Sequence, residues 1–402
     1  MKFLRDLVDK VKPTFSEGGK LSMLHSSFDA IETFLFVPNH TTKNGAHIRD
    51  GIDLKRTMFL VVIALIPALL FGMWNLGFQY HKAIGAEAGL IANLWPSLFE
   101  NLWYGFLQSL PIILVSYGVG LGIEMAFAQF RGHPVNEGFL VSGLLIPMVM
   151  PVGVPWWMVA LATAFAVIIG KEVFGGTGMN LLNPALTARM FLYIGYTPQM
   201  SGEQCWTPIA EGVATVDGYS GATTLSNVAA ASAKSAGWNE NLFSWKTSMI
   251  DSIIGTIPGS IGETSVIAIL IGAVILIAAG IGSWKIMLST VLGGLFMGWV
   301  MNLGGEGNAW TEMPAVNHLI IGGFMFGAVF MTTDPVSAAQ TERGKWIYGF
   351  LIGVLTVLIR VFNPGYPEGI MMAILLMNVF APLIDYYVVQ SNIKMRLKRV
   401  KA

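Results

Sequence analysis

The run Thr57-Met-Phe-Leu-Val-Val-Ile-Ala-Leu-Ile-Pro-Ala-Leu-Leu-Phe-Gly-Met-Trp-Asn-Leu-Gly-Phe78 contains no charged residue. A helix needs about 20 apolar residues to cross the hydrocarbon core of a bilayer, so this run predicts a membrane span. The rest of the 402-residue chain agrees, because 54% of it is hydrophobic and only 12% is charged. An ordinary soluble domain is about 25% charged. We therefore expect an all-α integral membrane protein.

Counting this run, ten stretches are candidates for transmembrane helices. They cover residues 57–78, 103–129, 138–154, 156–174, 184–197, 264–282, 286–303, 317–333, 346–362 and 369–390. The run at 184–197 is short for a span. The chain then divides into a basic N-terminal region, a five-helix half, a polar segment, a second five-helix half and a basic tail. These units are residues 1–56, 57–197, 198–263, 264–390 and 391–402.

Basic residues between the predicted spans are unevenly distributed. If the N-terminus is cytoplasmic, the inner side receives Arg131, Lys171, Lys285, Arg343, Lys345 and the tail from Lys394 to Lys401. The outer side receives Lys82, Lys234 and Lys246. Because cytoplasmic loops carry the excess of Lys and Arg, both termini are predicted to be cytoplasmic and residues 198–263 to lie outside.

The two halves resemble each other weakly. Residues 140–151 align with residues 320–331, and both Val173-Phe174 and Val361-Phe362 are followed by Gly, Asn and Pro. Since five spans is an odd number, the halves would have opposite orientations. Inverted repeats place binding sites near their interface, where broken helices expose backbone groups. The alternative is chance similarity between glycine-rich helices.

The N-terminal region contains one amphipathic pattern. Leu24, Phe28, Ile31 and Leu35 recur at helical spacing, and Pro38 ends the run. The pattern predicts a helix lying on the membrane surface, or equally a helix packed on a partner protein.

Composition excludes several functions. The single cysteine, Cys205, rules out an internal disulfide and an iron–sulfur cluster held by this chain alone. The six histidines lack metal-ligand spacing, so no fixed transition-metal site is expected. The formal net charge is zero, and no nucleic-acid partner is indicated.

The stretch Asp217-Gly-Tyr-Ser-Gly-Ala-Thr-Thr224 is polar and small-residued within a mostly apolar chain. It has no periodic apolar face, which predicts an exposed turn presenting hydroxyl groups. A modifying enzyme can reach such a threonine. An ordinary loop is the alternative.

Residues 175–189 form a glycine-rich stretch between two predicted spans. Asn180 and Asn183 are three residues apart, so on a helical turn both amides would face the same way. An amide both donates and accepts hydrogen bonds, which suits the polar edge of a flavin ring. Helix capping before Pro184 is the simpler interpretation.

Four carboxylates are candidates for a cation path, because carboxylate oxygens suit hard cations. Glu124 lies inside a predicted span, where an ionisable group is costly and usually functional. Asp334, Asp385 and Asp29 are equally compatible with structural roles. Phe324, Phe326 and Phe330 are candidates for a constriction or for ordinary packing.

These residues resemble a known family. Asp217-Gly-Tyr-Ser-Gly-Ala-Thr223 is similar to the flavinylation motif read by flavin transferases, whose last threonine takes FMN through a phosphoester. Lys171-Glu-Val-Phe-Gly-Gly-Thr-Gly178, Asn183-Pro-Ala-Leu186 and Thr333-Asp-Pro-Val-Ser-Ala338 strengthen the match. Over nearly its whole length the chain resembles the B subunits of sodium-translocating NADH:quinone oxidoreductases. Residues 47–56 distinguish it from the shorter D subunit of Rnf complexes.

The resemblance implies a membrane component of a translocase, NADH:ubiquinone reductase, in the bacterial inner membrane, with a fold like that of urea transporters. Thr223 would carry covalent FMN within the motif residues Asp217, Ser220, Gly221 and Ala222. Riboflavin would bind noncovalently near the cytoplasm at Asn180 and Asn183. Electrons would pass from FMN on the C subunit through these flavins to ubiquinone. Partners would be the A, C, D, E and F subunits, Na⁺, lipid and a flavin transferase.

Further residue roles also follow from the resemblance. Asp29, Glu124, Asp334 and Asp385 align with acidic positions used in sodium uptake or translocation. The quinone region would include Leu24, Phe28 and Gly120. The family has paired glycines at this last position, whereas this chain has Gly120-Leu121.

Two rival interpretations remain at this stage. A channel or secondary transporter for a small solute or ion accounts equally well for the inverted repeat and the broken helices. It has no need of the Ser-Gly-Ala-Thr stretch. A passive scaffold for other redox proteins is the second rival.

Overall fold

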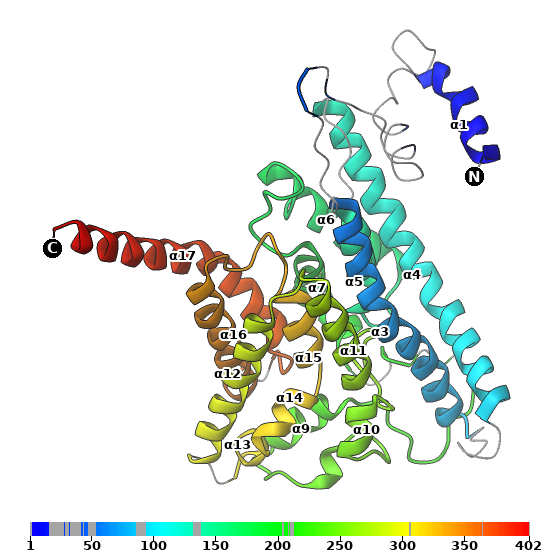
Figure 1. Cartoon of the computed structure of the whole chain (residues 1–402). Coiled ribbons are helices and arrows are strands. Elements are labelled where there is room, and N and C mark those ends of the chain that lie inside the picture. Colours follow the sequence, from blue (N-terminus) through cyan, green and yellow to red (C-terminus); the bar gives the residue numbers. More distant parts are fainter. Residues whose placement is uncertain are drawn as a thin grey trace.

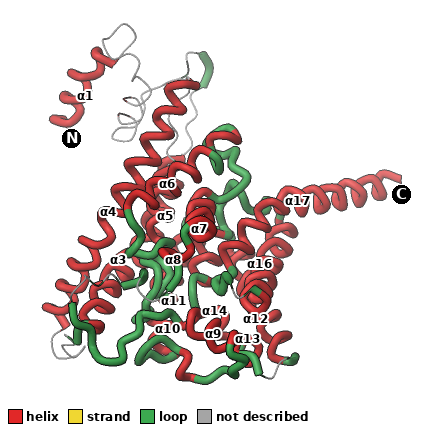
Figure 2. The backbone as a smooth tube through the Cα atoms, turned by 180° about the vertical axis from the view of Figure 1, so that it is seen from behind, coloured by secondary structure: helices red, strands yellow, loops and turns green. Residues whose placement is uncertain are grey.

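The computed structural model describes residues 2–15, 28, 32, 42, 44–46, 54–85, 94–131, 138–202, 205–207, 209, 213–304, 307–363 and 365–401. All regular structure in these residues is helical (Figure 2), as expected from the composition. Leu24, Ile31 and Leu35 of the predicted amphipathic helix lie outside the described residues, and so does Asp29. Phe28 is described and stacks on Phe15 of helix α1 (Lys2–Phe15), with ring centroids 4.8 Å apart.

The first half of the chain contains the longest helices. It comprises α3 (Leu54–Ala83), α4 (Leu94–Arg131), α5 (Phe139–Met148), α6 (Trp156–Ile168), η2 (Glu172–Phe174), α7 (Pro184–Gly195) and α8 (Thr197–Met200). Pro67 and Pro111 lie inside α3 and α4 without ending them, which membrane helices tolerate when neighbouring groups satisfy the freed backbone.

The polar segment that follows forms short capped helices, α9 (Thr224–Ala233), η3 (Glu240–Leu242) and α10 (Met249–Ile254). Ser248 and Asp251 form a reciprocal capping box at the start of α10. Figure 1 shows α9 and α10 at the lower end of the molecule, whereas α3 begins at the upper end.

The second half is more fragmented. It comprises α11 (Val266–Ala278), α12 (Trp284–Asn302), α13 (Ala309–Glu312), α14 (Ala315–Ile320), α15 (Phe324–Phe326), the π-helical turn η4 (Gly327–Met331), α16 (Glu342–Phe362) and α17 (Ile370–Lys401). Gly322, with φ +70°, separates α14 from α15. Only a residue without Cβ adopts this conformation readily.

Six helices in the described part of the chain are long and apolar enough to cross a membrane. They are residues 56–83, 97–131, 156–174, 284–302, 342–362 and 370–399. The other four predicted spans correspond to shorter or broken helices: α5, α7, α11 and the run from α14 to η4. Sequence hydropathy does not distinguish a continuous helix from a broken one, because a broken helix buried among others is equally apolar.

The exposed surface of these helices is apolar. On α11, Ile267, Leu270, Ile271 and Val274 are 46–66% exposed. Such a surface would be unfavourable in water and suits lipid. The chain is an integral membrane protein.

Two pairs of helices join the halves. The first helices of each half, α3 and α11, contact each other, and so do the last, α7 and α17. Within the second half, α12 and α16 approach closely at Gly293 and Gly353, where a Cβ on either residue would strike the opposite backbone. Small residues allow this in membrane helices.

Candidate functional site

Two cavities contain four of the site residues selected from the sequence, Thr223 in one and Asn180, Asn183 and Asp334 in the other. The Thr223 cavity measures about 340 Å³ and lies beside the start of α9. The Asn183 cavity measures about 100 Å³ and is lined by residues of α3, α5 and α11, by the loop before α7 and by the segment after η4.

Thr223 lies on the wall of the first cavity as the N-cap of α9. Its Oγ1 accepts a hydrogen bond from the Ser226 backbone N–H at 3.3 Å, and the side chain is half-buried. The adjacent Thr224 is buried, with its hydroxyl 3.1 Å from that of Ser244. Both threonines line the cavity, but only Thr223 is partly exposed.

The rest of the motif divides into an exposed and a buried part. Asp217 and Gly218 are exposed, and Gly218 has φ +75°. Gly221 and Ala222 are buried, and the Ala222 N–H donates to Ser220 Oγ at 3.3 Å. The prediction of an exposed turn is therefore right for the first residues and wrong for Gly221, Ala222 and Thr224. Tertiary packing of α9 covers them.

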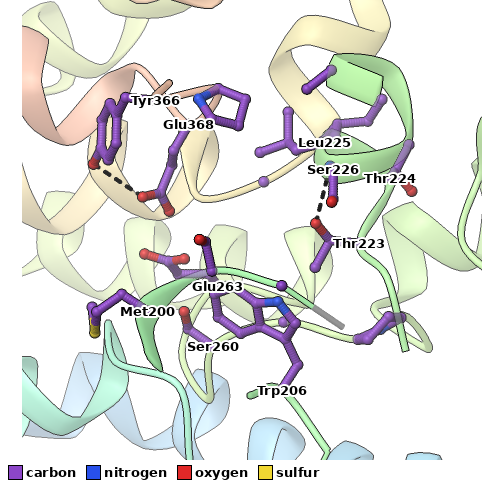
Figure 3. Close-up of a pocket in the computed structure, with 18 of the residues that line it drawn as sticks. Met200, Trp206, Thr223, Thr224, Leu225, Ser226, Ser260, Glu263, Tyr366 and Glu368 are labelled. Carbon is purple, nitrogen blue, oxygen red and sulfur yellow. Dashed lines mark hydrogen bonds between the residues drawn. The ribbon is translucent and has the colours of Figure 1, made fainter. Parts of the chain in front are cut away.

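A cluster of charged side chains lies across the cavity from Thr223. Arg189 donates to Glu263 Oε1 at 2.8 Å and also to Glu368 and the Val149 carbonyl. Tyr366 Oη donates to Glu368 Oε2 at 3.0 Å. Figure 3 shows Thr223 on one side and Glu263, Glu368 and Tyr366 on the other.

Burial dominates the electrostatics of this cluster. It raises the pKa of Glu263 to about 8, although the Arg189 guanidinium opposes that effect. Sequence reasoning missed the cluster, because its members are far apart in the chain. One signal was present: Arg189 is a lone arginine in a predicted span, and such residues are functional candidates.

The Asn183 cavity contains both asparagines, and they do not share a helical turn. Asn183 is the N-cap of α7, and its Oδ1 accepts from the Ala185 N–H at 3.0 Å. Asn180 lies in the preceding loop and donates to the Leu182 carbonyl at 3.0 Å. The simpler interpretation, capping before Pro184, is confirmed for Asn183. Because Pro184 starts the helix, the residues before it are in the loop.

Two of the candidate carboxylates are in or beside the Asn183 cavity. Asp334 lines it and accepts from Ser337 Oγ at 2.6 Å. Glu124, on α4, forms a buried ion pair with Lys171, which also lines the cavity. Lys171 is thus buried rather than part of an exposed cytoplasmic loop. Phe330 contributes another part of the wall.

Asp385 and Gly120 lie apart from both cavities. Asp385, on α17, accepts from the backbone N–H groups of Gln340 at 2.7 Å and Thr341 at 3.0 Å, just before α16. Gly120, on α4, faces the ring of Phe139, which a Cβ would strike. Both arrangements are structural contacts that the sequence pattern did not reveal.

The residues around Thr223 fit FMN. The cavity volume falls within the roughly 300–1,000 Å³ of small-molecule sites, and the N-terminus of α9 favours a phosphate. The Asn183 cavity offers amide, carboxylate and ammonium groups, but its volume of about 100 Å³ is too small for a flavin ring. A flavin there requires this cavity to widen.

The fold and the cavities define a multispan helical membrane protein with polar sites enclosed between its two halves. Residues 41–394 match the NQR2, RnfD, RnfE family, and the chain belongs to this family.

Individual relatives match almost end to end. A protein of Stutzerimonas stutzeri is 46% identical, covering 98% of this chain and 99% of the relative. One from Chromohalobacter salexigens is 47% identical, covering 98% and 96%. Each relative is named as the B subunit of a Na(+)-translocating NADH-quinone reductase.

Proposed function

We propose that this chain is the membrane redox component of a sodium-pumping NADH:quinone oxidoreductase and carries FMN on Thr223. The supporting observation is the position of Thr223, whose hydroxyl caps α9 at the rim of a cavity of about 340 Å³. The names of relatives matched over 98% of the chain point to the same complex.

The chain contributes position and charge at this site. Thr223 Oγ1 holds the phosphate of FMN through a phosphoester, and the N-terminus of α9 stabilises its negative charge. The Ser226 N–H, which donates to Thr223 Oγ1 at 3.3 Å, would be close enough to help hold the phosphate. FMN supplies one-electron transfer, while the protein sets its location and electrostatics.

Riboflavin is proposed to bind at the Asn183 cavity, with Asn180 and Asn183 contacting its polar edge. Support comes from the shared lining of the cavity by these two amides. Binding requires the widening described above, and it costs Asn180 its bond to the Leu182 carbonyl. Riboflavin held there would supply one-electron transfer between the FMN on Thr223 and ubiquinone.

Sodium is the transported ion, and Glu124, Asp334, Asp385 and Asp29 are proposed to serve its path. Asp334 lines the Asn183 cavity together with Lys171, and Lys171 forms an ion pair with Glu124. The quinone region is proposed to include Gly120, Phe28 and Leu24. The A, C, D, E and F subunits complete the complex.

The proposed topology has ten spans in two inverted halves, as in urea transporters, with both termini cytoplasmic in the bacterial inner membrane. Support comes from the contacts between the first helices and between the last helices of the two halves. The positions of α9 and the start of α3 at opposite ends are also consistent with it (Figure 1).

The test is the flavin content of the denatured, washed polypeptide. We expect the wild-type chain to keep in-gel flavin fluorescence and the mass of one added FMN. Thr223→Ala should lose both while the protein remains in the membrane. Thr224→Val is the matched control and should keep them, because the buried Thr224 hydroxyl bonds Ser244.

Covalent flavin in Thr223→Ala would move the attachment site. A wild-type chain without flavin that moves a solute unaided would instead favour the channel or transporter interpretation.

A further inference from the structure

Helices α12 and α16 form an open groove on the surface of the second half, which we call the α12–α16 groove. The two helices pack side by side (Figure 1) along small residues. A Cβ on Gly349 would strike Ser289 Oγ, and a Cβ on Gly293 would strike the Phe350 carbonyl. Larger side chains flank this seam, and the groove between them measures about 340 Å³. It is lined by Ser289, Leu292, Trp346, Ile347, Phe350 and Leu351.

All but one of these lining residues are apolar. Leu292 and Ile347 are each 45% exposed, so the groove is accessible from outside the helix bundle. The exception, Ser289, is buried, and its hydroxyl donates to the Ile286 carbonyl at 3.0 Å. Exposed apolar patches on proteins mark contacts with a membrane or with another protein, and the charges around the groove favour one of these.

The end of the groove at which both helices begin carries cationic side chains. Lys285 lies one helical turn before Ser289 on α12, and Lys345 directly precedes Trp346 on α16. Both ammonium groups pair with the carboxylate of Glu342, Lys345 at 2.9 Å. Two cations therefore share one carboxylate at the mouth of an apolar groove.

The remaining charges at this end do not restore neutrality. Arg343 is exposed beside Glu342 and adds a third cation. Asp385 is also near, and it accepts from the backbone N–H groups of Gln340 and Thr341. Within the described part of the chain, three cations thus face two carboxylates. The Glu342 side chain is 64% exposed, and exposed ion pairs are weak, so an added anion would not have to break a strong interaction.

Two further features at this end suit an anionic headgroup. Both helices present their N-termini there, α12 at Trp284 and α16 at Glu342, and a helix N-terminus favours negative charge. Among the described residues, Ser283, the N-cap of α12, makes no side-chain capping bond. The rings of Trp284 and Trp346 meet edge to face, 5.9 Å apart, and tryptophan is typical of the depth of lipid headgroups.

A ligand for this groove must therefore be anionic at one end and apolar along its length. We propose that the α12–α16 groove binds an anionic phospholipid, with its phosphate at Lys285 and Lys345 and the first part of an acyl chain along Leu292 and Phe350. The seven residues from Lys285 to Leu292 rise about 10 Å along the helix, and the rest of the chain continues into the bilayer. Basic pockets between membrane helices are typical sites for such lipids.

The experiment uses the assembled complex that contains this chain, reconstituted in nanodiscs of phosphatidylcholine. A small fraction of the lipid is phosphatidylglycerol with a photoactivatable group on its acyl chain, and labelled peptides are mapped by mass spectrometry after illumination. We expect labelling of the peptide that contains residues 346–351. Phosphatidylcholine with the same photoactivatable group should label this peptide severalfold less, because it carries no net charge.

Two pairs of variants separate the headgroup contact from the acyl contact. Lys285→Gln with Lys345→Gln should lower the phosphatidylglycerol label to the level of phosphatidylcholine. Lys394→Gln with Lys398→Gln removes the same charge from the exposed end of α17 and should leave the label unchanged.

The second pair concerns the apolar part of the groove. Leu292→Trp fills the groove and should reduce the label severalfold. Leu288→Trp is its control, because Leu288 is 42% exposed on the same helix but does not line the groove.

Equal labelling by the two lipids, or a label that persists in both the double lysine variant and Leu292→Trp, would overturn the proposal. Absence of any label at residues 346–351 in the assembled complex would also overturn it, because another subunit would then cover the groove.

Discussion

The two cavities differ in how their polar groups are engaged. In the Asn183 cavity, the asparagines already bond backbone groups of their own loop and helix, and Glu124 is paired with Lys171. In the Thr223 cavity, the partly exposed Thr223 hydroxyl accepts from one backbone N–H at 3.3 Å, and the volume is larger. Residue type therefore identifies candidate binding stretches. The hydrogen bonds and ion pairs that the side chains already make decide which cavity can bind a ligand without rearrangement.

The largest expected effect is a loss of stability on removing the buried cation beside each cavity, Arg189 or Lys171. Arg189→Met leaves Glu263 and Glu368 without their shared cation, and removing one member of a buried ion pair costs about 3–5 kcal/mol. Lys171→Met strands only Glu124, so it should cost less. Thermal unfolding in detergent, followed by tryptophan fluorescence, measures both.

Pairing each substitution with removal of the stranded charge provides the control. Lys171→Met with Glu124→Leu should recover most of the lost stability. If Arg189→Met unfolds at the wild-type temperature, the Arg189 guanidinium does not stabilise the buried carboxyl groups of Glu263 and Glu368.

A smaller loss of stability is expected from a substitution at Gly120 on α4. Gly120→Ala drives a methyl group into the buried Phe139 ring, and overpacking costs about 1–3 kcal/mol. Lys171 lies 6.0 Å from the centroid of that ring, so its pair with Glu124 should be disturbed too. The melting temperature in detergent measures the loss.

Gly122 is the matched position, because a Cβ there meets nothing within 4 Å. Gly122→Ala should leave the melting temperature unchanged or raise it, since alanine favours a helix by about 1 kcal/mol over glycine. Equal losses in both variants would mean that Phe139 is not the cause.

The smallest expected effect is a change in sodium dependence, which tests whether the sodium path lies at the Asn183 cavity and not at the Thr223 cavity. Glu124→Ala should raise the sodium concentration needed for half-maximal quinone reduction severalfold, because a carboxylate on the path is lost. Thr264→Val, in the Thr223 cavity, should leave that concentration unchanged.

Glu342→Ala serves as a second control, since Glu342 is an exposed carboxylate paired with Lys285 and Lys345. Unchanged sodium dependence in Glu124→Ala would falsify a role for Glu124 in cation uptake.

Sequence reasoning reached the helical class, the membrane location and one stretch of each cavity lining, those containing Thr223 and Asn183. It found the run at α7 short for a span, but not that α5 and α11 are short as well, because hydropathy does not record where an apolar helix ends. It favoured helix capping before Pro184, which is confirmed for Asn183; the alternative, with Asn180 and Asn183 on one helical turn, is wrong because Pro184 starts α7 after them.

What the sequence determined by itself was local: apolar runs long enough for lipid, a proline and asparagine that start α7, and a small-residue motif ending at Thr223. Tertiary structure alone decided that Arg189, Glu263 and Glu368 meet opposite Thr223, and that Glu124 pairs with Lys171. The physical reason is that a buried charge is stable only with a partner. That partner is chosen by the packing of distant helices, which no local pattern records.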